Sequence, residues 1–180
     1  LKLHARGWIR LPPARTRTHR PCAQAPAAVP PELRVGPPPI AGPLCGLQPV
    51  RFELAHTPAL RQRARALLAQ YHYRGFHGAV GENVQYLIRD CGGAELAVMV
   101  FGAAAWKVAA RDQFIGWSPQ QRQEHLARIA NQQRFLILPW VRAPHLASHL
   151  LALATRRLSQ DWQDRYGHPV WLVETFVETD

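Results

Sequence analysis

An aromatic stretch punctuated by glycine, Tyr71 to Gly78, holds the side chains best suited to chemistry. The imidazole of His72 can take up or release a proton near neutral pH. The rings of Tyr71 and Tyr73 can stack on a nucleobase, and a tyrosine hydroxyl can donate a proton. A rigid loop held by aromatic packing is the alternative. Because binding and catalytic residues concentrate in loops, we take His72 and Tyr73 as candidate catalytic residues and Tyr71 as a candidate nucleic-acid contact.

A second group of charged side chains lies between residues 105 and 117. Lys107 and Arg111 are four residues apart and would share one face of a helix, where together they suit a phosphate or a carboxylate. Asp112 can orient Arg111, or it can form a local ion pair with Arg111 and do no more. Both interpretations stay open, with Lys107 and Arg111 as candidate anion-binding residues and Asp112 as a candidate catalytic residue.

Two further arginines flank a predicted strand at 134–141. Arg134 opens that strand, and Arg142 follows it, just before a helix expected to begin near His145. The first N–H groups of a helix and the positive end of its dipole favour an anion. We therefore predict that Arg134 and Arg142 bind an anionic group or nucleic acid.

An acidic residue, Glu174, interrupts an apolar run from Val173 to Val177. A carboxylate buried in such a strand is costly unless it is paired or functional. Glu174 is therefore either a candidate catalytic residue or one half of a structural ion pair with an arginine.

Several well-defined types of site have no signature in the sequence. Cys22, Cys45 and Cys91 are scattered and odd in number, and they form neither a disulfide framework nor a zinc pattern. A Gly-rich phosphate loop and a Ser–His–acid set in recognisable context are also missing. We predict no metal site, and the sequence leaves both the cofactor and the question of enzymatic activity open.

Basic residues dominate the composition. The 180 residues carry a formal net charge of +10, and residues 1–50 hold seven Lys and Arg against one acid. This balance indicates a polyanionic partner, DNA first of all, although an Arg-rich composition inherited from a GC-rich genome is the alternative. No apolar run approaches the roughly 20 residues of a membrane span, and the start lacks a secretory signal. We expect no membrane partner and a cytoplasmic location.

Hydrophobic periodicity predicts the elements that must position these residues. Strands are expected at 50–55, 84–89, 95–101, 134–141 and 169–177, the second and third forming a hairpin. Helices are expected from Pro58 to about Gln70, over 103–110, from Ser118 to about Asn131, and over 145–166. The last helix carries a continuous apolar stripe and ends at Gly167. The strand–helix–strand crossover at the end of the chain predicts two parallel strands.

The order strand, helix, hairpin, helical insertion, strand, helix, strand predicts an α/β domain with a mixed sheet and helices on both faces. This order is similar to that of GCN5-related acyltransferases, in which acetyl-coenzyme A enters between two splayed parallel strands. The similarity is an analogy of fold. Those enzymes bind the pyrophosphate with a Gly-rich turn, whereas residues 142–148 contain no glycine.

Composition divides the chain into three segments. Residues 1–11 match the end of a winged-helix-like segment, a helix end followed by glycine and a basic strand, or else a frayed terminus. Residues 12–49 contain eleven of the sixteen prolines and predict a flexible Pro- and Arg-rich linker. Residues 50–180 form the α/β core domain, which we expect to be incomplete at its C-terminus. Because the chain starts at Leu1 and stops just after a strand, we expect a fragment truncated at both ends.

Motifs in the core domain resemble the DruA family of Druantia anti-phage proteins, a bacterial family of long-uncharacterised function that is also found in transposon-associated proteins. They occur in order, and among them are Tyr71-His-Tyr-x-Gly, Trp106-Lys-x-Ala-Ala-Arg-Asp112, Ile115-Gly-Trp-Ser118, Arg134-Phe-Leu-Ile-Leu-Pro-Trp-Val141 and Val173-Glu-Thr-Phe-Val177. The resemblance implies a role in defence or mobile-element biology, beside a helicase-like partner acting on DNA. It supplies no settled catalytic residues. The run Asn131-Gln-Gln133 departs from the family pattern of two asparagines and a small residue.

Three functions follow as hypotheses. The first is a DNA-associated defence or mobile-element protein. The second is an acyltransferase-like group-transfer enzyme using an anionic cofactor, with Glu174 or His72 as the base. The third is a structural adaptor in a defence complex, for which Lys107→Ala, Arg142→Ala and Glu174→Gln should leave defence intact. Convergence of the candidate residues on one cleft would favour a site, and their dispersal would favour the adaptor.

Overall fold

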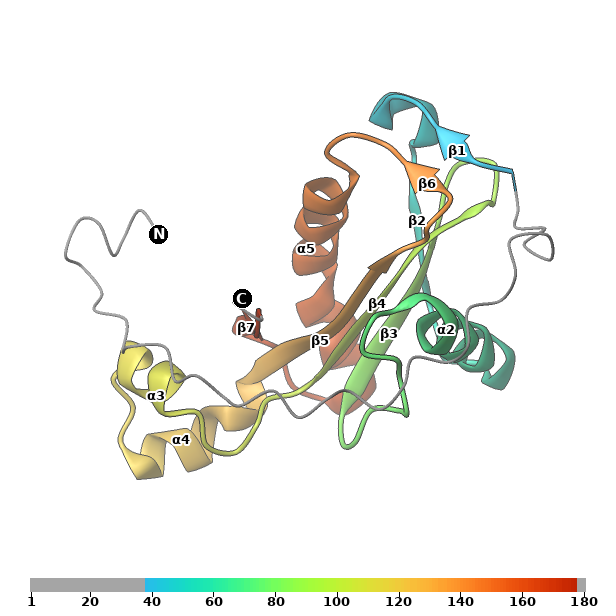
Figure 1. The fold of residues 1–180 in the computed structure, drawn as a ribbon. Coiled ribbons are helices and arrows are strands. Elements are labelled where there is room, and N and C mark those ends of the chain that lie inside the picture. Colours follow the sequence, from blue (N-terminus) through green and yellow to red (C-terminus); the bar gives the residue numbers. More distant parts are fainter. Residues whose placement is uncertain (1–37, 178–180) are drawn as a thin grey trace, which may run out of the picture. The chain divides into compact units, whose positions relative to one another are not determined.

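The computed structural model describes residues 38–177, which form a five-stranded mixed sheet in the order β2-β3-β4-β5-β7 and a separate pair, β1-β6 (Figure 1). The strands are β1 (Ile40–Ala41), β2 (Arg51–Leu54), β3 (Asn83–Arg89), β4 (Glu95–Ala103), β5 (Ile129–Ile137), β6 (Val141–Arg142) and β7 (Leu172–Thr175). The helices are α2 (Pro58–Tyr71), α3 (Ala109–Ile115), α4 (Pro119–His125) and α5 (Leu146–Tyr166), with 3-10 turns η2 (Leu44–Leu47) and η3 (Leu126–Arg128). The predicted winged-helix-like segment 1–11 and residues 12–37 of the predicted linker lie outside the described residues.

The sheet combines antiparallel and parallel pairing. Strands β2 to β5 pair as antiparallel neighbours, and β5 pairs with β7 in parallel. The predicted hairpin is confirmed, because β3 and β4 pair from Asn83 with Gly102 to Arg89 with Glu95. The predicted parallel crossover is confirmed too, since α5 joins β5 to β7.

Helices cover the sheet on both of its faces, with α2 on one side and α5 on the other (Figure 1). Accordingly, β4 is buried from Leu96 to Gly102 without the alternation of a strand that faces water on one side. Five residues of α5 spaced four apart, from Leu146 to Trp162, are buried, which confirms the predicted apolar stripe. Each such leucine contributes about 1.5–3 kcal/mol by leaving water.

Local signals set the ends of the two long helices. Thr57 caps α2 by accepting a hydrogen bond from Leu60 N, and Pro58 occupies the first helical position. Gly167 ends α5 in the left-handed conformation, with φ of 79°, which a residue without Cβ adopts at little cost.

The region between β4 and β5 differs from its prediction. The helix expected over 103–110 is wrong: β4 continues to Ala103, and α3 starts only at Ala109. The alanines of this stretch favour a helix, but Ala103 pairs with Ala130 of β5, and its N–H donates to the carbonyl oxygen of Glu82. Sheet pairing therefore overrides helix propensity here.

The boundary between α4 and β5 also differs. The helix starts as predicted, with a capping box between Ser118 and Gln121, but it ends at His125 instead of near Asn131. Strand β5 begins at Ile129, five residues before the predicted Arg134. Pairing with β4 and β7 on both sides holds the polar residues Asn131 and Gln132 in the strand.

Residues 38–49, expected to belong to the flexible linker, are packed against the core domain. Ile40 and Ala41 form a parallel pair with Val141 and Arg142. Leu47, in η2, is buried in the main hydrophobic core. Apolar side chains between the prolines thus give this segment contacts that its proline content alone does not predict.

Candidate functional site

Strands β5 and β7 lie side by side over a short length only. Their pairing covers Ile129 to Gln132 on β5 and Leu172 to Thr175 on β7. At this point β5 contains a bulge. Gln132 pairs with Phe101 and Arg134 with Val100, so Gln133 between them has no partner in β4. A bulge bends its strand, and β5 continues along β4 to Ile137. Beyond Gln132, the side of β5 that faces β7 has no strand of the described residues beside it.

A cleft of about 890 Å³ lies at this point of divergence. Three segments far apart in the sequence line it: residues 72–74 after α2, residues 131–135 of β5, and residues 175–177 at the end of β7, with Leu151 of α5. None of the twelve lining residues is acidic, and Arg74 and Arg134 are basic. The cleft is therefore suited to an anionic or neutral ligand and not to a cation.

Exposed aromatic rings border the cleft. His72 and Tyr73 stack with their ring centroids 4.7 Å apart and their planes inclined by 23°. Tyr73 is 78% exposed and Phe176 is 57% exposed. Rings held in water in this way offer flat apolar surface on which a base can stack.

Arg134 fixes the loop that presents these rings. Its Nε donates to the carbonyl oxygen of Gly75 over 2.9 Å, and its Nη1 donates to the carbonyl oxygen of Gln133. Gly75 has φ of 59° and donates its N–H to the carbonyl oxygen of His72. This tight turn, tied to β5, keeps His72 and Tyr73 at the wall of the cleft.

The surroundings of His72 favour the neutral form of its imidazole. Burial lowers the pKa of His72, and the nearby charges of Arg134 and Arg74 lower it further. Its Nδ1 accepts a hydrogen bond from the N–H of Arg74 over 3.2 Å. The neutral ring therefore carries its proton on Nε2 and can donate a hydrogen bond from that atom.

Two residues that line the cleft contain buried polar atoms without partners among the described residues. The side-chain Oδ1 of Asn131 and Nε2 of Gln132 are buried and make no hydrogen bond within the described residues. Both residues line the cleft. An unpaired buried polar group costs about 1–3 kcal/mol, so each of these atoms lowers the stability of the native state locally.

A separate cluster of charges joins α3, α4 and β7. Asp112 accepts from Arg111 at 2.9 Å and from Arg122 at 3.0 Å, and Glu174 accepts from Arg111 at 3.4 Å. The side chain of Arg111 is only 5% exposed, and that of Glu174 only 11%. The two arginines and the two carboxylates of this cluster balance in charge. Arg111 forms both ion pairs that the sequence offered as structural alternatives, one with Asp112 and one with Glu174.

The two carboxyl groups of this cluster respond differently to their surroundings. Burial raises the pKa of Glu174, and Arg111 opposes that rise. Burial acts in the same direction on Asp112, but hydrogen bonds from Arg111 and Arg122 outweigh it and hold the pKa of Asp112 below its usual value. Asp112 is thus firmly ionised, while Glu174 takes up a proton more readily than a free glutamate.

Tyr71 is used for packing. It is half-buried at the end of α2, and its ring meets that of Trp140 edge to face, with centroids 5.3 Å apart. It does not line the cleft, although the next residue, His72, does.

The remaining basic candidates lie elsewhere. Lys107 is exposed in the loop between β4 and α3, outside any helix, so the predicted shared helical face with Arg111 is wrong. Arg142 is exposed in β6 and does not line the cleft. The N–H of Leu146, the first residue of α5, donates to the carbonyl oxygen of Ala143 over 3.3 Å, which occupies one of the donors expected to attract an anion.

The candidate residues therefore do not converge on a single cleft. His72, Tyr73 and Arg134 share the cleft, whereas Asp112, Arg111 and Glu174 share the ion cluster. Sequence reasoning missed Gln133, whose bulge shapes the cleft. Gly102, which pairs with Asn131 and lies close to the side chain of Gln133, was the available signal, since glycine within a strand often marks a bulge or a close approach.

Between residues 38 and 177, no three His, Cys, Asp or Glu side chains are grouped so as to hold a metal ion. Over the same residues, no helix has both the length and the apolar character needed to cross a bilayer.

Comparison with known proteins places the chain in a family. No curated protein and no solved structure is significantly similar to it. A family model described as Druantia protein DruA matches residues 58–180, which include α2, the cleft, the ion cluster and β7. The match covers more than half of the chain and agrees with the motifs in the sequence. The chain therefore belongs to the DruA family of Druantia proteins.

Proposed function

We propose that this chain is a DNA-associated component of DruA-type anti-phage defence, and that the cleft between β5 and β7 binds single-stranded nucleic acid. The observation that carries the proposal is the stacked pair of His72 and Tyr73 beside Arg134, in a cleft whose described lining residues include no acid. Family membership suggests the anti-phage role. A helicase-like partner would supply the single strand, as the family resemblance implies.

The chemistry of the cleft suits a single strand better than a duplex. A stacked base needs an open ring face, and Tyr73 is largely exposed. Phosphates need cations nearby, and Arg74 and Arg134 line the same cleft. A single strand exposes the base faces that such stacking needs, whereas a duplex buries them between neighbouring base pairs.

Fluorescence anisotropy with labelled single-stranded and duplex oligonucleotides tests the proposal. We expect the full-length protein to prefer the single strand, with an affinity that falls steeply as salt rises. Tyr73→Ala should weaken binding by about 1–3 kcal/mol, the usual worth of one stacked base. Phe114→Ala, which removes an 82% exposed ring from α3, is the matched control and should bind normally. No binding at low salt, or equal loss in both variants, would contradict the proposal.

A second candidate is group transfer in an acyltransferase-like manner. The observation that favours it is the position of the cleft, which opens where the parallel strands β5 and β7 part. Enzymes with the GCN5-related order place acetyl-coenzyme A between two such strands. The exposed Arg142 and the start of α5 do not line this cleft, so the anionic part of such a cofactor would depend on Arg74 and Arg134.

Thermal unfolding with acetyl-coenzyme A and with coenzyme A tests this second function. A ligand that binds the native state raises the melting temperature, and its stabilisation grows with the logarithm of one plus the ratio of free ligand concentration to Kd. We expect a rise that Arg134→Gln reduces if the cofactor occupies the cleft. If neither ligand nor any oligonucleotide shifts the transition, and the cleft variants still support defence in cells, the structural adaptor is the remaining function.

A further inference from the structure

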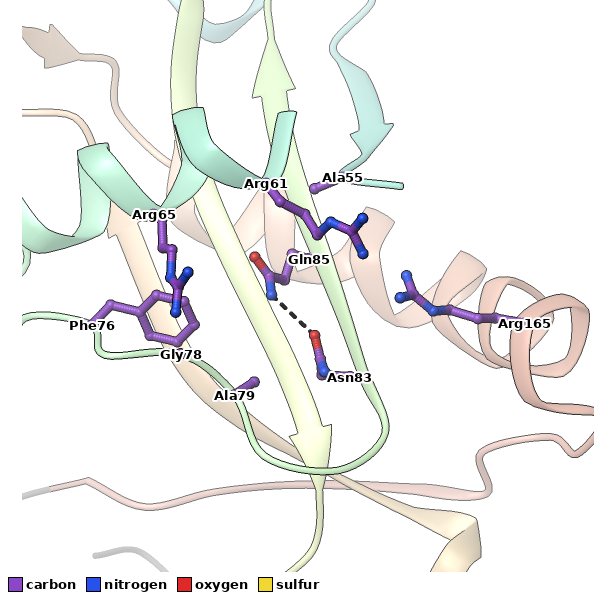
Figure 2. A pocket seen from close by; sticks show the side chains of 9 residues that line it. All are labelled: Ala55, Arg61, Arg65, Phe76, Gly78, Ala79, Asn83, Gln85 and Arg165. Carbon is purple, nitrogen blue, oxygen red and sulfur yellow. Dashed lines mark hydrogen bonds between the residues drawn. The ribbon is translucent and has the colours of Figure 1, made fainter. Parts of the chain in front are cut away.

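Three arginines line a small pocket of about 200 Å³ (Figure 2). Arg61 and Arg65 come from α2, and Arg165 comes from the end of α5. The other lining residues are Ala55, Phe76, Gly78, Ala79, Asn83 and Gln85, so none of the nine is acidic. None of these residues lines the cleft between β5 and β7.

No carboxylate within residues 38–177 pairs with the arginines of this pocket, although Arg165 lies over the ring of Tyr166 at 5.4 Å from its centroid. The guanidinium groups of Arg61 and Arg165 point toward each other across the pocket (Figure 2). Arg65 donates from Nη2 to the carbonyl oxygen of His77 over 3.2 Å, and no ion pair of the described residues includes any of the three arginines. Like charges that face each other are unfavourable, and an anion between them both removes the repulsion and accepts charge-assisted hydrogen bonds.

A polar floor adds a second requirement on the ligand. Gln85 Nε2 donates to Asn83 Oδ1 over 3.0 Å, and Asn83 Nδ2 donates to the carbonyl oxygen of Gly81. With both amides oriented in this way, Gln85 Oε1 is a buried acceptor that has no hydrogen-bond partner within the described residues. The pocket is therefore best satisfied by a small group that carries anionic oxygens and one hydroxyl donor.

We propose that this pocket binds a phosphate group that carries a P–OH, either inorganic phosphate or the terminal phosphate monoester of a nucleic-acid strand. Arg61 and Arg165 hold the anionic oxygens, and the P–OH of the singly protonated form donates to Gln85 Oε1. A phosphodiester within a strand lacks that hydroxyl. The assignment uses no residue of the cleft, so it stands or fails separately from the proposed function.

Thermal unfolding of the full-length protein in phosphate and in sulfate, at equal ionic strength and about pH 6, tests the site, because the monoester is partly protonated there. We expect phosphate to raise the melting temperature and sulfate, which has no hydroxyl at this pH, to raise it less. In Arg61→Gln/Arg165→Gln the dissociation constant for phosphate should rise about tenfold or more, as expected for the loss of charge-assisted bonds. Arg156→Gln, an exposed arginine of α5 outside the pocket, is the charge-matched control.

Two outcomes would overturn the site. One is an equal response to phosphate and sulfate, and the other is an unchanged phosphate response in the double variant. If the double variant does not fold, Arg61→Gln alone replaces it, since that side chain is exposed. Oligonucleotides with a 5′-phosphate or a 5′-hydroxyl identify the source: tighter binding of the phosphorylated strand that depends on Arg61 assigns a strand end, and equal binding assigns free phosphate.

Discussion

Arg134 Nε lies 2.9 Å from the carbonyl oxygen of Gly75, a hydrogen bond that joins the bulged part of β5 to the loop after α2. The two residues are 59 positions apart in the chain. Through this bond, the strand that forms one wall of the cleft also holds the loop that carries His72 and Tyr73. Arg134 thus acts on the cleft twice, as a cation that lines it and as the anchor of its aromatic pair.

Replacing Arg134 by glutamine should affect the loop after α2 more than the folding of the whole protein. The variant loses a charge-assisted hydrogen bond, which is typically worth about 1.5–3 kcal/mol. Because Arg134 is only half-buried, water can replace part of this interaction and the loss of stability should be smaller. We expect a modest fall in the free energy of urea unfolding and faster amide hydrogen exchange at residues 72–76. Arg156→Gln serves as control. Unchanged exchange in that loop would show that the bond to Gly75 does not order it.

The titration of His72 is a direct test of the electrostatics at the cleft. Burial and the charges of Arg134 and Arg74 lower its pKa, so an NMR titration should give a midpoint below the usual value of 6.5. Arg134→Gln should raise the midpoint only in part, because burial is the larger cause. A midpoint at or above 6.5 in the unaltered protein would contradict this description.

The sign of the effect of His72 on stability follows from the same shift. The unfolded chain binds a proton on this residue more readily than the folded chain does. The stabilisation from neutral His72 is therefore fully present above the pKa that His72 has in the unfolded chain. It is lost as the pH falls toward the lower pKa of His72 in the folded protein. In urea unfolding, His72→Gln should lose less stability than the unaltered protein between about pH 7 and pH 5. Parallel pH profiles would rule the effect out.

The ion cluster predicts strong coupling between Arg111 and Glu174. Arg111→Met removes the only cation bonded to Glu174 among the described residues and leaves a buried carboxylate, a change that typically costs about 3–5 kcal/mol. Adding Glu174→Met should recover part of that loss, since an apolar pair needs no charge compensation. Urea unfolding of both single variants and the double variant measures the coupling. Additive losses would show that the contact of 3.4 Å carries little energy.

The sequence predicted the two long helices well because their signals lie within the helices themselves. The apolar residues of α5, spaced four apart, together with Gly167 at its end, contain the whole signal for that helix. The same holds for α2, where Thr57 and Pro58 mark the start. By contrast, the polar run at 131–133 reads as the end of a helix, and only the pairing of Asn131 and Gln132 with β4 and β7 makes it part of a strand.

The cleft was beyond prediction because it depends on register. Nothing in the sequence next to Gln133 shows that the pairing of β5 with β4 shifts there, so the sequence does not reveal that residues 72–74 and 175–177 meet beside it. Glu174 shows the intermediate case. Its chemistry indicated a functional group or an ion pair, and the choice of partner, Arg111, required the placement of α3 against β7.

Gly102 and Gln133 offer the sharpest test of the bulge. A Cβ at Gly102 would collide with the side-chain amide of Gln133, which lines the cleft. Because that amide is the end of a flexible side chain, Gly102→Ala should cost little stability, and the loss of glycine from a strand can offset the cost by about 0.5–1 kcal/mol. The displaced amide, however, should lower the affinity of the cleft for single-stranded DNA.

A double-mutant cycle isolates this effect. In the Gln133→Ala background no amide remains to be displaced, so Gly102→Ala should leave DNA affinity unchanged there while lowering it in the unaltered protein. Anisotropy measures the affinities, and urea unfolding confirms that all four proteins are folded. An equal affinity loss in both backgrounds would mean that Gly102 acts through the strand itself, and a stability loss above about 2 kcal/mol would mean that Gln133 cannot move aside.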